Sequence, residues 1–181
     1  MSSQDSKTNN EDTINLVKKF IASNQRKRRN LVNDIESSAE SLFAVGEEII
    51  KDIDREGDDW CIGWVLQVLK KYKPEFFEND IYNNWFFTNS AIDLRYNKLQ
   101  LNLLKQNFEE ADRLTSAYLR KLAGKVAENR GYVFYSEVKD MPGEDLVTID
   151  RLWNIYSQGK FGFSNQAKLL KSVGKRYDLL W

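Results

Sequence analysis

Residues 145–166 read DLVTIDRLWNIYSQGKFGFSNQ, and this stretch contains a helix, the end of that helix, an aromatic turn and the start of another helix. Apolar side chains recur at three- and four-residue spacing, as on one face of an α-helix, at Leu146, Ile149, Leu152, Trp153 and Tyr156. Gly159 stands where a left-handed cap would end the helix, and Gly162 lets the backbone turn tightly between two phenylalanines. Ser164 is predicted to cap a second helix over residues 165–173. The pattern favours two packed core helices with a tight connection.

Helical periodicity extends over most of the remaining sequence. Upstream, three apolar stretches near residues 14–21, 31–53 and 60–69 predict a small antiparallel helical bundle. Residues 76–97 are rich in asparagine and aromatics and are predicted to link two regions, and residues 98–124 predict two further helices. We therefore expect an all-α fold with a helical bundle over residues 13–90 and a second helical domain over residues 91–181.

One short segment has the composition of a strand. Residues 131–138 are rich in β-branched and aromatic side chains. The sequence offers no evident partner strand, so we interpret this segment as helix or loop.

Composition limits the classes of protein to which the chain can belong. Basic and acidic residues both number 27 in 181 residues, so no general attraction to nucleic acid is predicted. No apolar run is long enough to span a membrane. Residues 1–12 carry acids and lack an apolar core, so we expect a disordered tail, and neither a secretory signal nor a transit peptide. A single cysteine cannot form an internal disulfide, which fits a reducing compartment.

The same composition argues against catalysis. The sequence has no histidine and therefore lacks the usual general base and the commonest metal ligand. Cys61 lies in an apolar stripe and is predicted to be a buried structural thiol, and the basic run 26–29 is predicted to be a solvated turn between helices. Three acids are interpreted as an ordinary hydrated helix face, namely Glu109, Glu110 and Asp112. We predict no catalytic residues, no metal site and no enzymatic activity.

The motifs of the second region resemble those of a known family. In order, they are Pro142, Asp145–Leu146, Ile149–Trp153, Ser157–Gly159 and Phe161–Gln166. Further matches are Asn107–Asp112, Thr115, Tyr135–Val138, Ser172–Lys175 and Trp181. This pattern covers about half of the chain and is similar to the genomes-uncoupled-4 family, the tetrapyrrole-binding regulators of magnesium chelatase.

The resemblance implies a function. Members of that family bind protoporphyrin IX or magnesium protoporphyrin IX in a cupped, partly open apolar cleft. They stimulate magnesium chelatase through its large porphyrin-binding subunit, at the entry to chlorophyll biosynthesis, without being enzymes. A broad apolar surface with a few cations at its rim suits such a ligand. Peripheral association with a membrane stays open, whereas nucleic acid and a transmembrane segment are not expected.

The resemblance also implies site residues. The porphyrin-facing wall is expected to comprise Phe134, Tyr135, Val138 and Met141. Of Phe161 and Phe163, one is expected to line the cleft and the other to hold the core. Ser116 stands where some family members have an arginine, so Arg113 or Arg120, one turn away, is expected to meet a porphyrin carboxylate instead.

Two further expectations concern completeness and location. The family continues beyond the position of Trp181 with an aromatic- and arginine-bearing segment, so residues 91–181 are expected to form an incomplete regulator domain. Heavy use of lysine, asparagine and isoleucine without a transit peptide predicts a plastid-encoded algal protein in the chloroplast, with a cyanobacterial cytoplasm as the alternative.

A different class of function also fits the pattern. Residues 98–124 look like one paired-helix unit, so a protein-interaction module or signalling adaptor that no longer binds tetrapyrrole is the second interpretation. Repeat scaffolds need about three units for stability, and only one is visible.

Overall fold

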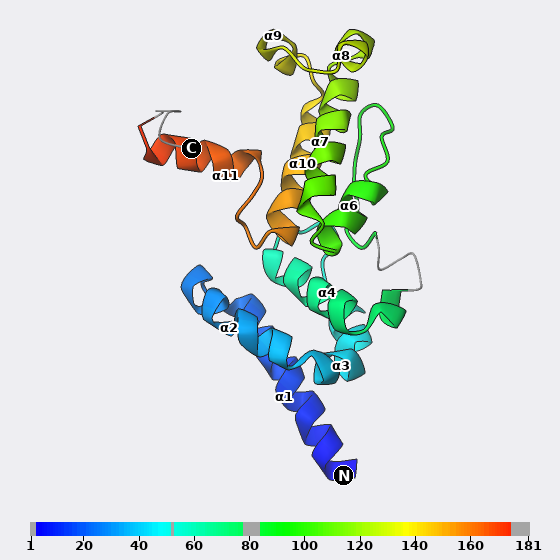
Figure 1. The fold of residues 1–181 in the computed structure, drawn as a ribbon. Coiled ribbons are helices and arrows are strands. Elements are labelled where there is room, and N and C mark those ends of the chain that lie inside the picture. Colours follow the sequence, from blue (N-terminus) through cyan, green and yellow to red (C-terminus); the bar gives the residue numbers. More distant parts are fainter. Residues whose placement is uncertain (1–2, 52, 78–83, 175–181) are drawn as a thin grey trace.

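The computed structural model describes residues 3–51, 53–77 and 84–174, and over these residues it contains helices and no strand (Figure 1). This confirms the all-α fold class. In chain order the helices are α1 (Ser3–Ala22), α2 (Gln25–Ser37), α3 (Ala39–Lys51), α4 (Trp60–Tyr72), the short 3₁₀ helix η1 (Pro74–Phe77), α6 (Asn97–Leu104), α7 (Phe108–Leu122), α8 (Lys125–Arg130), α9 (Tyr135–Val138), α10 (Gly143–Tyr156) and α11 (Phe163–Ser172). None of the helices in these ranges is both long and apolar enough to cross a lipid bilayer.

Helices α1 to α4 form a bundle at the N-terminal end of the molecule (Figure 1). Their apolar faces meet in a core that includes Val17, Phe20, Ile35 and Leu42. Cys61 lies in this core with no exposed surface, as predicted, and burial raises the pKa of its thiol. The thiol is therefore a packing group and not a nucleophile.

The bundle differs from the sequence-based expectation in three respects. Residues 3–12, expected to be disordered, belong to α1, where Asn9 bonds Ser41 of α3 at 3.0 Å. The stretch expected as one helix over residues 31–53 is divided at Ser38, which ends α2. The basic run lies within α2 and not in a turn, because Asn24 caps this helix by accepting the Lys27 N–H at 3.1 Å. Arg28 then forms an ion pair with Asp59 at 2.9 Å.

Helix α4 joins the bundle to the rest of the chain. Gly63 lies against the backbone of Ile155 in α10, so closely that a Cβ atom there would come within 2.7 Å of Ile155 Cγ2. Four residues on, Gln67 donates from Nε2 to the carbonyl oxygens of Leu103 at 2.9 Å and of Tyr156 at 2.8 Å. These carbonyls belong to the last turns of α6 and α10, so one buried amide satisfies the ends of two helices.

A single hydrophobic core therefore runs through the described residues from Val17 to Tyr156. Residues 76–97, predicted to be a linker, contribute to it in their described part, because Trp85, Phe86 and Tyr96 are buried. Gln100 of α6 holds Phe86 by accepting its N–H at 2.7 Å and donating to its carbonyl at 3.1 Å. The division into two domains stays a prediction, and a core shared by both regions can form without it.

Helices α6, α7 and α10 carry the elements expected to form the site. Helices α6 and α7 meet near Asn107, as predicted, and α8 and α9 form a tip beyond the end of α7 (Figure 1). Residues 131–138 form a turn and the helix α9, in agreement with the helix-or-loop interpretation. In Figure 1 both α9 and α11 project to the left of α10.

The aromatic turn before α11 is tight for a reason that involves α10. Gly162 has φ +116°, and a Cβ atom there would lie 2.5 Å from Asp150 Oδ1. The same oxygen accepts the backbone N–H of Ser164 at 3.0 Å. Ser164 was predicted to cap α11, and this prediction is wrong. Helix α11 already begins at Phe163, and Asp150 of α10 binds its free N–H. Gly159 adopts the expected left-handed conformation, with φ +69°.

We predict that Gly63→Ala destabilises the protein strongly. The added methyl group would overlap Ile155, and forcing extra volume into a packed core costs about 1–3 kcal/mol or more. Gly143→Ala is the matched control, because a Cβ atom at Gly143 meets nothing within 4 Å. Urea denaturation followed by circular dichroism measures both variants, and equal stability of the two would refute the proposed close helix contact.

Candidate functional site

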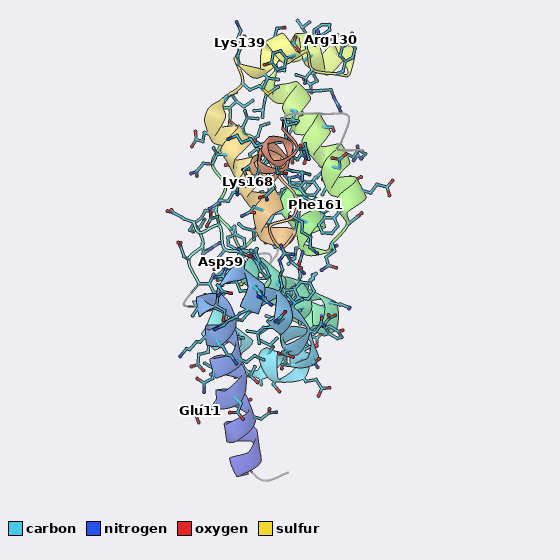
Figure 2. All side chains as sticks on the ribbon, turned by 90° about the vertical axis from the view of Figure 1, so that its left-hand side faces the viewer. Glu11, Asp59, Arg130, Lys139, Phe161 and Lys168 are labelled. Carbon is cyan, nitrogen blue, oxygen red and sulfur yellow. The ribbon has the colours of Figure 1, made fainter. Side chains whose placement is uncertain are left out.

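A hollow of about 280 Å³ lies between α7, α10 and the start of α11. Its lining is mostly aromatic, with Phe108 from α7, Trp153 from α10, and Phe161 and Phe163 from the aromatic turn. Figure 2 shows α11 end-on in front of α7 and α10, with Phe161 beneath it. The hollow thus opens on the side of the molecule from which α11 projects.

Trp153 forms the floor of this hollow. Its indole N–H donates to Thr115 Oγ1 at 2.9 Å, which satisfies the one polar atom of a side chain that is 9% exposed. Phe108 stacks on it with ring centroids 6.0 Å apart, and Phe161 meets both rings edge-on. The predicted burial of Trp153 is confirmed, and the edge that remains exposed faces the hollow.

Ser157 holds the turn that carries Phe161. This buried serine at the end of α10 accepts the backbone N–H groups of Phe161 at 2.8 Å and of Lys160 at 3.2 Å. Asp150 fixes the other side of the turn through Ser164. The aromatic wall is therefore positioned by hydrogen bonds from a rigid helix, which keeps it in place without a ligand.

A polar hollow follows α7 beside the aromatic one, with Arg113, Ser116 and Arg120 in its lining. The structure thus brings together both predicted arginines and the serine between them. Arg113 forms two bonds with Glu110, from Nε at 2.6 Å and from a terminal nitrogen at 2.5 Å. This contact lowers the pKa of Glu110. Arg120 lies one turn beyond Ser116 and two turns beyond Arg113 along α7.

The tip formed by α8 and α9 presents apolar side chains to solvent. Tyr135 is 95% exposed, and Tyr132, Phe134 and Val138 are also exposed. Arg130 lies against two of these rings, 4.7 Å from the Tyr132 centroid and 4.0 Å from that of Phe134. It is a cation in contact with aromatic faces, an arrangement that stiffens the tip.

Glu137 closes the tip into a defined conformation. Its Oε2 accepts from Arg130 at 2.6 Å and from the backbone N–H of Phe134 at 2.7 Å. These bonds, chiefly the one from Phe134, lower the pKa of the Glu137 carboxyl group. Exposed aromatic residues are thus held in place by one carboxylate and one guanidinium group.

Some predicted site residues are placed differently from expectation. Met141 is only 7% exposed and belongs to the hydrophobic core, so it offers little surface to a ligand. Phe161 and Phe163 are 47% and 37% exposed and both line the hollow, so the expectation that one of them holds the core is wrong. The core beneath them is already filled by Trp153 and Leu152 of α10.

Other site residues were not singled out in advance. Phe108 and Thr115 appeared only as matched positions of the family pattern, and their roles as stacking partner and hydrogen-bond acceptor of Trp153 depend on the packing of α7 against α10. Nothing in the local pattern indicated that Asp150 caps α11. In the described ranges, no group of three or more cysteine and acidic side chains is arranged to hold a metal ion.

The fold and the site define a helical protein with an aromatic hollow, beside a polar one that is lined by two arginines and three acids. Comparison with known proteins identifies the family. A GUN4-like family model, where GUN4 stands for genomes uncoupled 4, matches residues 89–181. The chain belongs to this family.

Individual relatives agree with this assignment. The chain is 35% identical over 137 residues to the Ycf53-like protein of Synechocystis, covering 74% of this chain and 59% of that protein. It is 44% identical over 82 residues to the chloroplastic tetrapyrrole-binding protein of Arabidopsis thaliana, covering 45% of this chain and 31% of that one. The solved structure of GUN4 from Chlamydomonas reinhardtii is similar with a TM-score of 0.51 and 34% identity, over 53% of this chain and 64% of that one. The chain thus spans less than two thirds of the length of each of these relatives.

We predict that Trp153→Ala greatly weakens the fold. Truncation of a buried tryptophan costs about 3–5 kcal/mol, and here it also removes the hydrogen-bond partner of Thr115. Val147→Ala, an exposed position of the same helix, is the control and should change the free energy of unfolding little. Unchanged stability of Trp153→Ala in urea denaturation would contradict its role in the core.

We predict a pH-dependent opening of the tip. Because the pKa of Glu137 is lowered in the folded state, its stabilising contribution is present above the unfolded pKa of about 4.3 and is lost as the pH falls through the folded value. The amide proton of Phe134 should report this loss in an NMR pH titration with a midpoint below about 4.3. Glu137→Gln should abolish the transition, and Glu128→Gln in α8 should not. A midpoint at or above the ordinary glutamate value would contradict the mechanism.

Proposed function

We propose that this protein is a non-enzymatic porphyrin-binding regulator of magnesium chelatase. The observation that carries the proposal is the aromatic hollow beside α7, with Arg113 and Arg120 in the neighbouring polar hollow. Flat aromatic walls suit a macrocycle, which gains mainly by burial, and guanidinium groups suit its carboxylates, which gain by charge-assisted bonds. Protoporphyrin IX and magnesium protoporphyrin IX are the proposed ligands.

The exposed tip is proposed as the second wall of the site. Tyr135 has almost no contact with the rest of the protein, so it can pack on a ligand without breaking an existing interaction. Phe134 and Val138 stand beside it on a tip that Arg130 and Glu137 hold in place. Preorganised aromatic groups of this kind lower the entropy cost of binding. Phe161 and Phe163 provide the surface on the other side.

In this proposal the two arginines would meet the ligand's carboxylates in a hollow that is also lined by Glu109, Glu110 and Asp112. Arg113 is engaged by Glu110, so a porphyrin carboxylate would have to replace a carboxylate that the protein supplies. The Arg113–Glu110 pair is exposed, and exposed pairs contribute only about 0–1 kcal/mol, so exchange is inexpensive. Arg120, which lines the same hollow, is the second proposed contact.

The regulatory part of the proposal rests on the family. Stimulation of the chelatase through its large porphyrin-binding subunit is proposed because the chain matches the GUN4-like model and resembles a named tetrapyrrole-binding protein. Relatives in a plant chloroplast and in Synechocystis support a plastid or cyanobacterial location, and we propose the plastid. Addition of the chain to a reconstituted magnesium chelatase tests this part, because the rate of magnesium insertion should rise.

We predict that Tyr135→Ala weakens porphyrin binding without affecting the fold. Loss of about 60 Å² of apolar contact costs ~1.5 kcal/mol, which is roughly a tenfold rise in Kd. Deuteroporphyrin titration, followed by the Soret shift and by tryptophan quenching, measures this for the native chain and the variant. Tyr72→Ala is the matched control, an exposed tyrosine at the end of α4 in the bundle.

Two outcomes would redirect the proposal. Equal affinity of the native chain and Tyr135→Ala would mean that the ligand does not reach α9. Absence of any saturable Soret shift would favour a helical protein-interaction module instead.

A further inference from the structure

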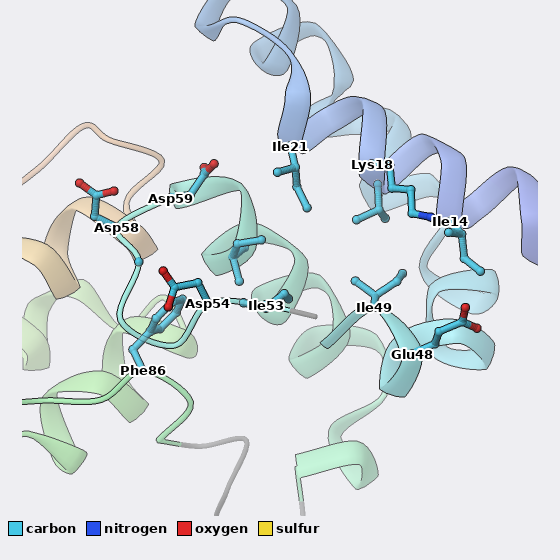
Figure 3. Close-up of a pocket in the computed structure, with 13 residues that line it drawn as sticks. Ile14, Lys18, Ile21, Glu48, Ile49, Ile53, Asp54, Asp58, Asp59 and Phe86 are labelled. Atoms are coloured by element: carbon cyan, nitrogen blue, oxygen red, sulfur yellow. The ribbon is translucent and has the colours of Figure 1, made fainter. Parts of the chain in front are cut away.

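A second hollow, of about 420 Å³, lies in the N-terminal bundle, away from the site described above (Figure 3). It is enclosed by α1, α3, the start of α4 and the segment before α4, with Phe86 at one end. It has no lining residue in common with the hollow beside α7 or the polar hollow next to it. The proposed tetrapyrrole site therefore does not account for it.

The walls of this hollow are aliphatic. Isoleucine and valine side chains project into it from facing helices, and Figure 3 shows those of α1 opposite those of α3. They are Ile14, Val17, Ile21, Ile49, Ile53 and Ile62. Its volume lies in the range of about 300–1,000 Å³ that is typical of small-molecule pockets.

The charges around the hollow are unevenly distributed. Toward one end, in the view of Figure 3, Lys18 of α1 and Glu48 of α3 carry opposite charges. The other end is formed by the segment before α4, where Asp54, Asp58 and Asp59 gather. A lysine thus offsets the acid at one end, and the lining contains no base at the other.

Nearby arginines offset only part of this negative charge. Asp59 is paired with Arg28, whereas none of the ion pairs within the described ranges involves Asp54 or Asp58. Arg151 lies behind the segment and donates to backbone carbonyl groups, including those of Glu56 and Phe87, and its charge offsets part of that of Asp58 and Asp54. An excess of carboxylate therefore remains at an end that opens onto an aliphatic cavity.

We propose that this hollow binds a small amphiphilic cation, that is, an aliphatic or aromatic body carrying one ammonium or guanidinium group. The body would fill the space between α1 and α3, where burial of apolar surface stabilises it. The cationic group would lie beside Asp54 and Asp58. Anionic amphiphiles, including porphyrins with their carboxylates, are disfavoured here by the same acids.

A matched pair of fluorescent probes tests the proposal on the full chain. Dansylcadaverine carries a naphthalene ring, a five-carbon chain and an ammonium group, and N-pentyl dansylamide has the same ring and chain without the charge. We expect saturable binding of dansylcadaverine with a blue shift of its emission, and roughly tenfold weaker binding of the neutral probe, as expected for two nearby carboxylates. Added salt should reduce the difference.

Variants assign the binding to this hollow. The double variant Asp54→Asn with Asp58→Asn keeps a side-chain oxygen at position 54 that can accept the Glu56 N–H, so the fold should persist. This variant should abolish the difference in affinity between the two probes. The control is Glu128→Gln with Asp140→Asn, which changes the net charge equally at the tip of the molecule.

Any of four results would overturn the inference. The first is equal affinity of the two probes for the native chain, and the second is unchanged dansylcadaverine affinity in the double variant. The third is displacement of dansylcadaverine by deuteroporphyrin together with loss of dansylcadaverine binding in Phe161→Ala. The third result would place the probe in the aromatic hollow. A lack of saturable binding of dansylcadaverine would equally refute the proposal.

Discussion

The close packing of α4 against α10 is the contact on which the rest of the structure depends. Gly63 has no side chain, so the backbone of Ile155 can approach it, and Gln67 can then reach the carbonyl groups that end α6 and α10. A larger residue at position 63 would separate the helices and leave these polar groups unpaired in the core. An unpaired buried hydrogen-bonding group costs about 1–3 kcal/mol, so steric fit and hydrogen bonding act in the same direction.

Helix α10 serves two purposes because of this contact. One of its faces is fixed in the core by α4, and from this fixed position Trp153 faces α7 while Asp150 binds the first turn of α11. The aromatic hollow is therefore built on a helix that several contacts hold in the core. A binding surface supported in this way changes little when a ligand arrives, which favours affinity because little order must be gained.

The two proposed sites show how a chain without net charge could bind ligands of different charge. Two arginines and three acids of α7 lie beside the aromatic hollow, and aspartates before α4 lie beside the aliphatic one. In the proposals above, arginines would meet the carboxylates of one ligand and aspartates the cationic group of the other, while the shape and chemistry of the walls would select the body of each ligand. Such a separation needs no excess of either charge over the whole sequence.

Local pattern was sufficient to predict the all-α fold, the helices α6, α7, α10 and α11, the burial of Cys61 and Trp153, and the tight turn at Gly162. The reason is that helix periodicity and turn chemistry depend on residues only a few positions apart. It was insufficient for the helical residues 3–12, the core position of Met141 and the shared exposure of Phe161 and Phe163. These features depend on partners far away in the chain, as Gln67 and Tyr156 do, 89 residues apart. The arrangement of α4, α7, α10 and α11 in space decides which faces are covered, and therefore which predicted residues line a site and which belong to the core.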